Sequence, residues 1–269
     1  MQLSDKVFVV TGGGNGMGRS VVLGLLARGA RVAALDLNEA GLAETAKLAA
    51  APEGRLTTHV INVADRKAVL ALPDAVIKAH GQVDGLLNIA GIIQPFVKIN
   101  ELDFDVIERV LNVNFWGVVN TSKAFLPYLL ARPAATLLNV SSMGGFLPVP
   151  GQAAYGASKA AVKLFTEALY AESQGTGLAV TVVFPGGVAT NITENSGVDT
   201  AKLMAAMGDA KAPKTTSVED AAAQIIGGVE KGSFRVVIGT DAKFMDRFSR
   251  FSPRRATLLI ANQMKSLLG

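Results

Sequence analysis

The chain has 269 residues, of which 49% are hydrophobic and 18% charged, with a net charge of +4 and no cysteine. This length suits one domain with a single large core, and the low charged content excludes a disordered chain. The net charge is too small to indicate nucleic-acid binding, and the lack of cysteine excludes disulfides and a thiol nucleophile. The N-terminus has no signal-peptide pattern, and no apolar stretch is long enough to span a membrane, so we expect a cytoplasmic protein.

Short apolar segments rich in Val and Leu alternate with helix-length segments along the chain. We expect strands at residues 7–11, 31–36, 56–60, 85–89, 135–140, 179–184 and 234–238, and helices at 19–28, 39–50 and 66–80 and between the later strands. Strands that are apolar throughout and alternate with helices predict a parallel sheet covered on both faces. The predicted fold is a single-domain α/β Rossmann fold over residues 1–242, a doubly wound parallel sheet of about seven strands flanked by helices.

The segment TGGGNGMGRS, residues 11–20, follows the first predicted strand and leads into the first helix. Read from Gly13 it nearly matches a mononucleotide P-loop, but Arg19 stands where that motif needs lysine. Read from Gly12 it is TGxxxGxG, in which glycines let the backbone approach a pyrophosphate at a helix N-terminus. The second interpretation predicts a dinucleotide site.

Asp36 ends the second predicted strand, 18 residues after Gly18. An acidic residue at about this separation accepts hydrogen bonds from the adenosine ribose, and its charge would repel the 2′-phosphate of NADP. Asn15, Leu37 and Asn38 supply no cation to bind such a phosphate. Asp36 could also be a helix N-cap or, in a P-loop enzyme, a magnesium ligand. The dinucleotide interpretation predicts NAD, with NADP as the less favoured alternative.

A second group of polar residues follows the strand at 135–140. Ser142 comes directly after this strand, and Tyr155 and Lys159 begin the next helix at positions i and i+4, on one face. A lysine ammonium near a phenol should lower the pKa of the phenol from about 10 toward neutrality. Tyr155 could then act as a general acid or base. Each residue alone could be an ordinary packing, turn or surface residue; together with a dinucleotide segment they favour a catalytic site.

The chain resembles the short-chain dehydrogenase/reductase family over about residues 3–240. The motifs behind this resemblance are TGxxxGxG at 11–18, NIAG at 88–91, NVN at 112–114, Ser142, the YxxxK pair Tyr155 and Lys159, and PGGVAT at 185–190. The gap of 13 residues between Ser142 and Tyr155 is the usual family spacing. The resemblance implies an oxidoreductase that acts on CH–OH groups with NAD or NADP and assembles as a homo-oligomer, a tetramer or dimer.

The resemblance also implies a role for each catalytic residue. Tyr155 should exchange a proton with the substrate oxygen, which Ser142 should orient. Lys159 should hold the nicotinamide ribose and lower the pKa of Tyr155. Asn114 should hold a water molecule in a proton relay through Lys159.

For the cofactor, the resemblance places residues 185–190 against the nicotinamide, with Thr190 near its carboxamide, and residues 88–91 on the adenosine side. The chain departs from the family at two places: Asn62 and Val63 stand where Asp-Val is usual, and Ile89 replaces an asparagine. The predicted cofactor residues are Gly12, Asn15, Gly16, Met17, Gly18, Asp36, Leu37, Asn62, Val63, Asn88, Ala90, Gly91, Tyr155, Lys159, Pro185, Gly186, Val188 and Thr190.

The substrate candidates are mostly apolar or small, which favours a lipophilic secondary alcohol or its ketone. They are Ile93, Gln94, Met143, Gly145, Gln152, Ile192 and residues up to 207, including Leu203, Met204 and Met207. Ordinary core filling explains these residues equally well. The weakly patterned stretch 190–217 is interpreted as a lid-like excursion. Two alternatives to an NAD-dependent enzyme stay open: an NADPH-dependent ketoreductase of the 3-oxoacyl type, and a non-catalytic nucleotide-binding scaffold.

The C-terminal segment, residues 243–269, is a basic amphipathic extension with six Lys or Arg and one acidic residue. Phe244, Phe248 and Phe251 recur at helical spacing between arginines, and Pro253 should interrupt the helix. Such a stretch could make peripheral contact with an anionic membrane, while a subunit contact or a lid over the pocket explains it equally well. His59 and His80 have no metal-ligand pattern, so we expect no metal.

Overall fold

A computed structural model describes residues 1–198 and 215–264 of the chain. Its seven strands form one sheet in the order β3-β2-β1-β4-β5-β6-β7, with every neighbouring pair parallel. The strands are β1 (Val7–Thr11), β2 (Arg31–Asp36), β3 (Leu56–Val60), β4 (Gly85–Asn88), β5 (Ala135–Val140), β6 (Leu178–Pro185) and β7 (Arg235–Ile238). This sheet confirms the predicted fold class.

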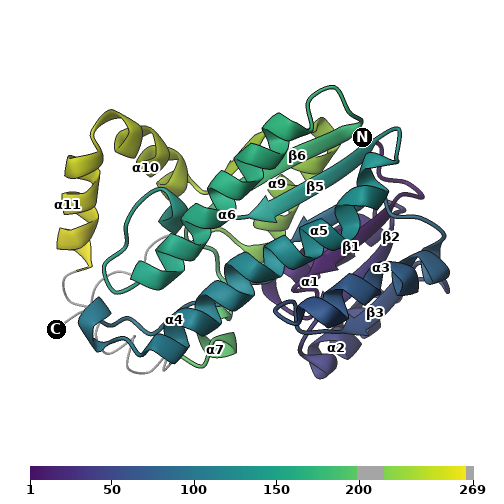
Figure 1. The fold of residues 1–269 in the computed structure, drawn as a ribbon, viewed down its shortest axis with the longest axis horizontal. Coiled ribbons are helices and arrows are strands. Elements are labelled where there is room, and N and C mark those ends of the chain that lie inside the picture. Colours follow the sequence, from purple (N-terminus) through teal and green to yellow (C-terminus); the bar gives the residue numbers. More distant parts are fainter. Residues whose placement is uncertain (199–214, 265–269) are drawn as a thin grey trace.

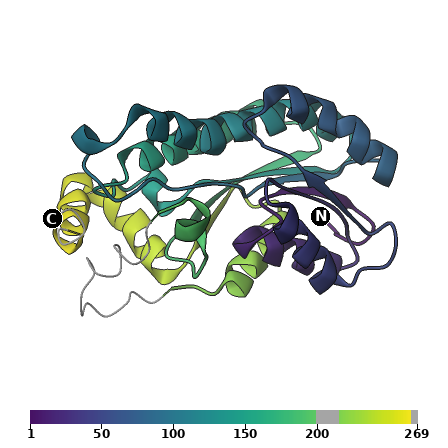
Figure 2. The same cartoon turned by 90° about the horizontal axis from the view of Figure 1, so that it is seen from below.

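Helices cover both faces of the sheet, which Figure 2 shows from below. On one face lie α1 (Gly16–Leu26), α2 (Glu39–Ala49) and α9 (Val218–Lys231); on the other lie α3 (Arg66–His80), α5 (Gly117–Leu130) and α6 (Ala153–Glu172). Each face has its own apolar core, the first built with α1 and α9 and the second with α3, α5 and α6. The shorter elements are η1 (Ile99–Glu101), α4 (Phe104–Leu111), the π-helical turn η2 (Asn112–Trp116), η3 (Met143–Gly145) and α7 (Ile192–Asn195).

The predicted strands agree with the observed strands to within one residue at each end. The first helix begins three residues earlier than predicted, at Gly16 rather than Arg19. The reason is that the Asn15 side chain accepts a hydrogen bond from the Gly16 N–H and caps the helix there. The second helix ends at Ala49, because Ala50 adopts a left-handed φ of 41°.

The C-terminal segment forms two helices, α10 (Thr240–Phe251) and α11 (Pro253–Gln263), at one end of the molecule (Figure 1). The break at Pro253 is therefore confirmed, while α10 begins before the predicted boundary at residue 242. A third apolar cluster joins these helices to the loop after β5 through Leu147, Met245, Ala256 and Ile260. The segment is therefore packed onto the catalytic domain rather than extended from it.

Only part of the predicted lid-like excursion belongs to the described residues. The short helix α7 lies in it, whereas residues 199–214, with the substrate candidates Leu203, Met204 and Met207, lie outside the described residues. Across residues 1–198 and 215–264, no helix has both the length and the apolar character needed to cross a membrane.

Candidate active site

A cleft of about 390 Å³ opens at the carboxyl ends of the strands β1 to β4. The strand order reverses between β1 and β4, the place where doubly wound sheets bind ligands. Twelve of the predicted cofactor residues line the cleft: Gly12, Asn15, Gly16, Met17, Gly18, Asp36, Leu37, Asn62, Val63, Ala90, Gly91 and Thr190. The structure thus brings together residues from five separate predicted segments.

Six predicted cofactor residues are not among those that line this cleft: Asn88, Tyr155, Lys159, Pro185, Gly186 and Val188. Asn88 lies in a buried network instead, donating to Asn139 at 2.8 Å and accepting from the Thr121 hydroxyl at 2.8 Å. Ile192, predicted as a substrate residue, lines the cleft. Asn195, which also lines the cleft, belongs to the predicted substrate stretch that ends at residue 207. The lining residues that sequence reasoning missed are Leu35, Asn38, Ile61, Ile89, Ile92 and Val113, each of which is adjacent in the sequence to, or within two residues of, a predicted residue.

The glycine turn after β1 forms an open backbone cradle. Gly12 and Gly16 have positive φ values of 73° and 50°, a region that favours glycine. A Cβ at Gly18 would collide with the carbonyl oxygen of Gly12, so only glycine allows α1 to start so close to β1. The first N–H groups of α1 and the positive end of its dipole face this turn, an arrangement that fits the pyrophosphate of a dinucleotide.

Two side chains brace the cradle in ways that the sequence did not reveal. The Arg19 guanidinium donates to the Gly14 carbonyl and, at 3.0 Å, to the Thr45 hydroxyl, and so ties the glycine turn to α2. The Thr11 hydroxyl accepts hydrogen bonds from the N–H groups of Ile89 and Ala90, at 3.0 and 3.1 Å. Arg19 and Thr11 therefore fix the positions of the backbone segments that form the walls of the cleft.

The Asp36 carboxylate lies at the adenosine end expected for the cleft. Its two oxygens accept hydrogen bonds from the N–H groups of Gly14 and Asn38, each at 2.9 Å. Among the described residues, neither Lys nor Arg lines this cleft. A 2′-phosphate on the adenosine ribose would therefore lie against a carboxylate, with no Lys or Arg in the cleft lining to balance its charge.

Ser142 and Tyr155 lie on either side of Gly144. A Cβ at Gly144 would lie 3.4 Å from Tyr155 Cε1 and 3.5 Å from Ser142 Oγ. The Ser142 hydroxyl also accepts from the Gly144 N–H at 3.0 Å and caps the short helix η3. The loop between β5 and α6 thus brings the predicted serine against the predicted tyrosine.

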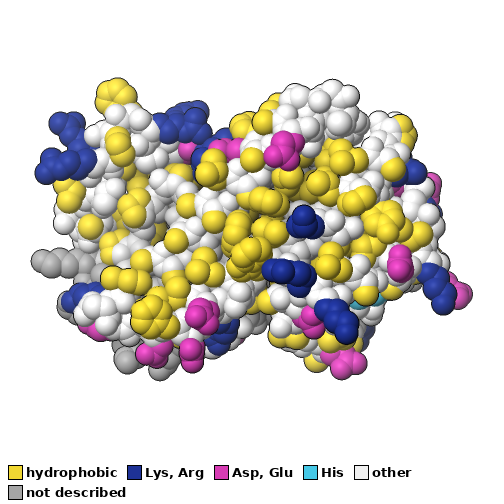
Figure 3. All heavy atoms as spheres, viewed as in Figure 1, with side chains coloured by type: hydrophobic (Ala, Val, Ile, Leu, Met, Phe, Trp, Pro, Cys, Tyr) yellow, Lys and Arg dark blue, Asp and Glu magenta, His cyan; other side chains and the backbone are white. Residues whose placement is uncertain are grey.

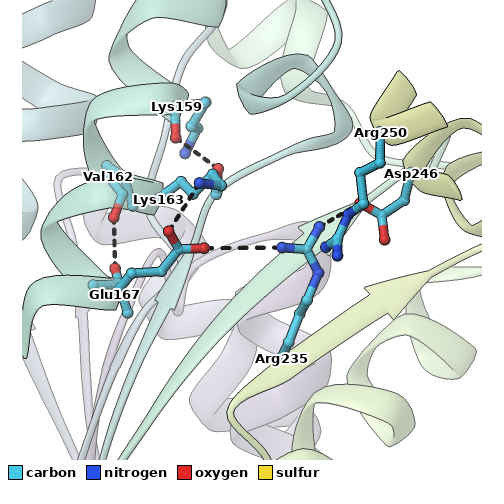
Figure 4. Close-up of polar contacts among 9 residues, drawn as sticks. Lys159, Val162, Lys163, Glu167, Arg235, Asp246 and Arg250 are labelled. Carbon is cyan, nitrogen blue, oxygen red and sulfur yellow. Dashed lines mark hydrogen bonds and ion pairs between the residues drawn. The ribbon is translucent and has the colours of Figure 1, made fainter. Parts of the chain in front are cut away.

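Lys159 and Asn114 adjoin the cleft through Gly91. A Cβ at Gly91 would lie 3.1 Å from Lys159 Nζ and 3.2 Å from Asn114 Oδ1. Lys159 is buried on α6 and donates to the Val140 carbonyl at 3.0 Å (Figure 4). Burial lowers the pKa of the Lys159 ammonium to about 8. Gly91 itself lines the cleft, so Lys159 and Asn114 lie at its edge.

Tyr155 differs from expectation in its acidity. Burial raises the pKa of its phenol, and a hydrogen bond with Ser142 offsets part of that rise. The expected lowering by Lys159 is wrong for this structure. The Lys159 ammonium lies 6.0 Å from the Tyr155 ring centroid and directs a hydrogen bond to the backbone instead.

Three amide side chains hold this group in place. Asn114 accepts from the Ile92 N–H and donates to the Ile92 carbonyl, both at 2.9 Å, and also donates to Ser158 at 3.0 Å. Its side chain is thus engaged with Ile92 and Ser158. Gln94 Oε1 accepts from the Tyr155 N–H at 3.0 Å, and Gln152 donates to the Gln94 carbonyl at 2.8 Å. Gln94 and Gln152, predicted to contact substrate, therefore brace the start of α6.

A family model for short chain dehydrogenases matches residues 6–202. The chain belongs to the short-chain dehydrogenase family. It is an oxidoreductase that uses NAD or NADP. The sequence of this short-chain dehydrogenase is 40% identical over 261 residues to a Mycobacterium tuberculosis relative named SadH, covering 95% of this chain and 94% of SadH.

Two further comparisons extend this result. The chain is 35% identical over 196 residues to the 3-oxoacyl-[acyl-carrier-protein] reductase FabG of Thermotoga maritima, covering 72% of this chain and 78% of FabG. Among solved structures, it matches the fold of a short-chain dehydrogenase/reductase from Burkholderia phymatum in complex with NAD. That match has a TM-score of 0.83 and 24% identity and covers 94% of this chain and 96% of the other. The match to SadH therefore covers more of the chain than the family model, which ends at residue 202.

Proposed function

We propose that this protein is a NAD-dependent oxidoreductase that interconverts a lipophilic secondary alcohol and its ketone. One observation carries the proposal: the glycine-rich cleft meets Lys159 and Asn114 at Gly91, and the Tyr155 ring centroid lies 6.0 Å from Lys159 Nζ. Asp36 lies at one end of this site, and Lys159 and Tyr155 lie at the other.

The proposed reaction needs one proton acceptor and one hydride acceptor. In the oxidative direction, the phenolate form of Tyr155, which its raised pKa makes the minor form at neutral pH, takes the proton of the substrate hydroxyl. The Ser142 hydroxyl hydrogen-bonds to the same oxygen. The hydrogen on the carbinol carbon leaves with its electron pair; the cofactor, when bound, supplies the chemistry that accepts this hydride. In the reductive direction, Tyr155 returns the proton to the ketone oxygen. With a pKa of about 8, Lys159 is mostly charged at neutral pH and can donate hydrogen bonds to ribose hydroxyls.

The choice of NAD over NADP is supported by the charge around Asp36. A 2′-phosphate placed there would lie against a carboxylate, and no Lys or Arg from the described residues lines the cleft. Initial rates with the two cofactors test this choice. Equal or faster turnover with NADP would contradict it and favour the alternative, an NADPH-dependent ketoreductase of the 3-oxoacyl type.

The lipophilic substrate is supported by the apolar surroundings of the loop that follows Ser142. Met143, Phe146 and Leu147 in this loop pack against apolar side chains of α10 and α11. A panel of secondary alcohols of increasing chain length, followed by NADH absorbance, should show kcat/KM rising with apolar size. Turnover restricted to small polar alcohols would contradict this part of the proposal.

The Tyr155→Phe variant separates catalysis from simple nucleotide binding. It should lose nearly all turnover while binding NADH with unchanged affinity, because only the proton-transferring hydroxyl is removed. Tyr128→Phe is the matched control, since Tyr128 lies half-exposed on α5, and its turnover should equal that of the wild type. Undiminished turnover in Tyr155→Phe would refute the mechanism, and a wild type that binds NADH without turning over any substrate would favour the scaffold alternative.

We also propose that the chain self-associates through the face formed by α4, α5 and α6, where hydrophobic side chains gather on the surface (Figure 3). Large apolar residues on this face are exposed, including Phe104, Trp116 and Leu164. Exposed apolar patches of this kind mark interaction surfaces.

A second surface supports peripheral contact with an anionic membrane. Phe244 and Phe251 are exposed on α10, with Phe251 at 89% of its area. The acidic residue between them, Asp246, is paired with Arg235 and Arg250, so the exposed charges around Phe251 are basic. Anionic vesicles should pellet the full-length protein at low salt, and Phe251→Ser should weaken this binding. The matched control Leu70→Ser, on α3, should bind as the wild type does. A wild type that never pellets would contradict the proposal.

A further inference from the structure

Asp241, in the first turn of α10, contacts a segment more than fifty residues earlier in the chain. Its Oδ2 accepts a hydrogen bond from the Gly187 N–H at 2.8 Å. A Cβ at Gly186 or Gly239 would collide with the Asp241 carboxylate. The glycines therefore let this carboxylate lie directly against the backbone after β6.

Among residues 1–198 and 215–264, the other hydrogen bonds that anchor this segment are all between backbone groups. The Gly186 N–H donates to the Ile238 carbonyl at 2.9 Å, and the Gly187 carbonyl accepts from the Thr216 N–H at 2.8 Å. The Ala189 N–H donates back to the Thr216 carbonyl at 3.0 Å. Asp241 thus anchors the segment through its side chain, so a substitution of Asp241 removes this hydrogen bond and leaves the backbone hydrogen bonds in place.

The anchored segment leads directly into the cleft. Thr190 lines the cleft, and its Cγ2 lies 3.5 Å from the position of a Cβ on Gly16. The backbone from Gly186 to Thr190 therefore runs from α10 to the glycine turn. A change in its path would alter the width of the cleft opposite α1.

Helix α10 is itself fixed to the catalytic helix α6. The Arg235 guanidinium pairs with Asp246 of α10 at 2.6 Å and lies 3.9 Å from Glu167 of α6, as Figure 4 shows. The same guanidinium lies 4.0 Å from the centroid of the Phe184 ring. Asp241 therefore belongs to a helix that is held by Arg235 of β7, and Arg235 in turn contacts both α6 and β6.

We propose that Asp241 is a positioning residue that holds residues 186–190 in the conformation that accepts the nicotinamide half of the cofactor. This inference rests on the proposed function and on the family resemblance, which implies that residues 185–190 lie against the nicotinamide. An acidic residue in the first turn of any helix favours the helix dipole. A role limited to that effect would change the stability of α10 without changing the affinity for one half of the cofactor.

The test is isothermal titration calorimetry, which measures the affinity of the full-length protein for NADH and for AMP. AMP lacks the nicotinamide half of the cofactor. Asp241→Ala should weaken NADH binding about tenfold, because a segment without its anchor has to be ordered on binding. AMP binding should not change. Asp241→Asn should bind NADH within about threefold of the wild type, because the amide oxygen still accepts from Gly187. Asp220→Ala, in the exposed first turn of α9, is the matched control and should bind as the wild type does.

The outcomes separate this inference from the proposed function. A wild type that binds neither NADH nor NADPH would overturn the proposed function. A wild type that binds NADH with the same affinity as Asp241→Ala would overturn the inference alone. So would an equal loss of NADH and AMP binding, or an Asp241→Asn variant as weak as Asp241→Ala. Should Asp241→Ala fail to fold, Gly186→Ala gives a second test: its methyl group would displace the carboxylate, and unchanged NADH binding would overturn the inference.

Discussion

At the scale of single residues, Asp36 shows how one side chain can serve both the fold and the ligand. Its carboxylate accepts two backbone hydrogen bonds, from Gly14 and Asn38, and so closes the glycine turn onto the end of β2. The same side chain lines the cleft, where its charge is the dominant electrostatic feature of the proposed ribose site. Cofactor choice and turn geometry are therefore coupled at this position.

Asp36→Asn removes the charge and keeps an acceptor for one of the two N–H groups. The ratio of kcat/KM for NADP to that for NAD should rise about tenfold, because the repulsion of the 2′-phosphate falls. Initial-rate kinetics with both cofactors measure this ratio. Asp65→Asn is the matched control, since Asp65 caps α3 outside the cleft, and it should leave the ratio unchanged. An unchanged ratio in Asp36→Asn would remove the argument for NAD.

Lys159 gives a pH-dependent contribution to stability with a definite sign. Burial lowers the pKa of Lys159 from 10.5 to about 8, so between pH 8 and 10.5 the unfolded chain binds the proton more strongly than the folded protein does. The cost of the buried charge is present in full below pH 8 and is relieved as the pH rises toward 10.5. The contribution of Lys159 to the free energy of unfolding should therefore rise with pH between about pH 8 and 10.5.

The comparison of wild type with Lys159→Met isolates this effect. The unfolding free energy of the wild type minus that of the variant should increase by on the order of 3 kcal/mol between pH 8 and 10.5. Urea unfolding at several pH values measures the difference. A difference that stays flat over this range would show that Lys159 is not buried as the structure has it.

At the scale of elements, the strands could be predicted and several helix details could not. Most strands are short apolar runs followed by polar residues, whereas β3 is LTTHV and is recognised from its place between two helices. Helix α1 begins before its apolar residues because Asn15 caps it, so the apolar pattern alone placed its start too late. The three phenylalanines of the C-terminal segment behave differently from one another, so their apolar stripe was only partly predicted. Phe248 packs into the third apolar cluster, whereas Phe244 and Phe251 are exposed.

The candidate site shows the same division. The types and spacing of Ser142, Tyr155 and Lys159 are visible in the sequence, because they lie close together in it. The bracing by Gln94 is not visible, because its partner, the Tyr155 N–H, lies 61 residues away. The roles of Arg19 and Thr11 likewise depend on contacts between separate elements.

The π-helical turn η2 is an element that no apolar periodicity predicts. It widens the helix by one residue at Asn112–Trp116, directly before α5. Within this turn Asn114 is buried against Ile92, whereas Asn112 is exposed. The turn thus supplies a matched pair of asparagines.

Asn114→Ala should lower the unfolding free energy by about 1–3 kcal/mol, because the partly buried N–H and carbonyl of Ile92 lose their partner. Asn112→Ala should change it by less than about 0.5 kcal/mol, as expected for a surface substitution. Urea unfolding of both variants measures the difference. Equal effects would contradict the assignment of Asn114 as the residue that holds the loop after β4.

At the scale of the whole molecule, the helices on one side of the sheet leave an apolar surface exposed. On the side of α4, α5 and α6, large apolar residues remain exposed after folding: Phe104, Trp116, Tyr128, Leu130 and Leu164. Figure 3 shows that hydrophobic side chains gather over these helices. Because exposed apolar area of this extent is unfavourable in water, we expect a second copy of the chain to cover it.

Leu164→Glu tests this surface. Leu164 lies on α6 with 67% of its area exposed, so the substitution costs the free protomer little. In a self-associated form, the new carboxylate would be buried without a partner. The free-energy cost of burying one unpaired charge should weaken association at least about tenfold. Light scattering after size exclusion should therefore show a smaller mass for Leu164→Glu than for the wild type at the same concentration. Leu70→Glu, on the exposed side of α3, is the matched control and should keep the wild-type mass. A wild type that is monomeric, or a Leu164→Glu protein with the wild-type oligomeric mass, would exclude this face as the subunit interface, because neither result is compatible with burial of Leu164 between copies.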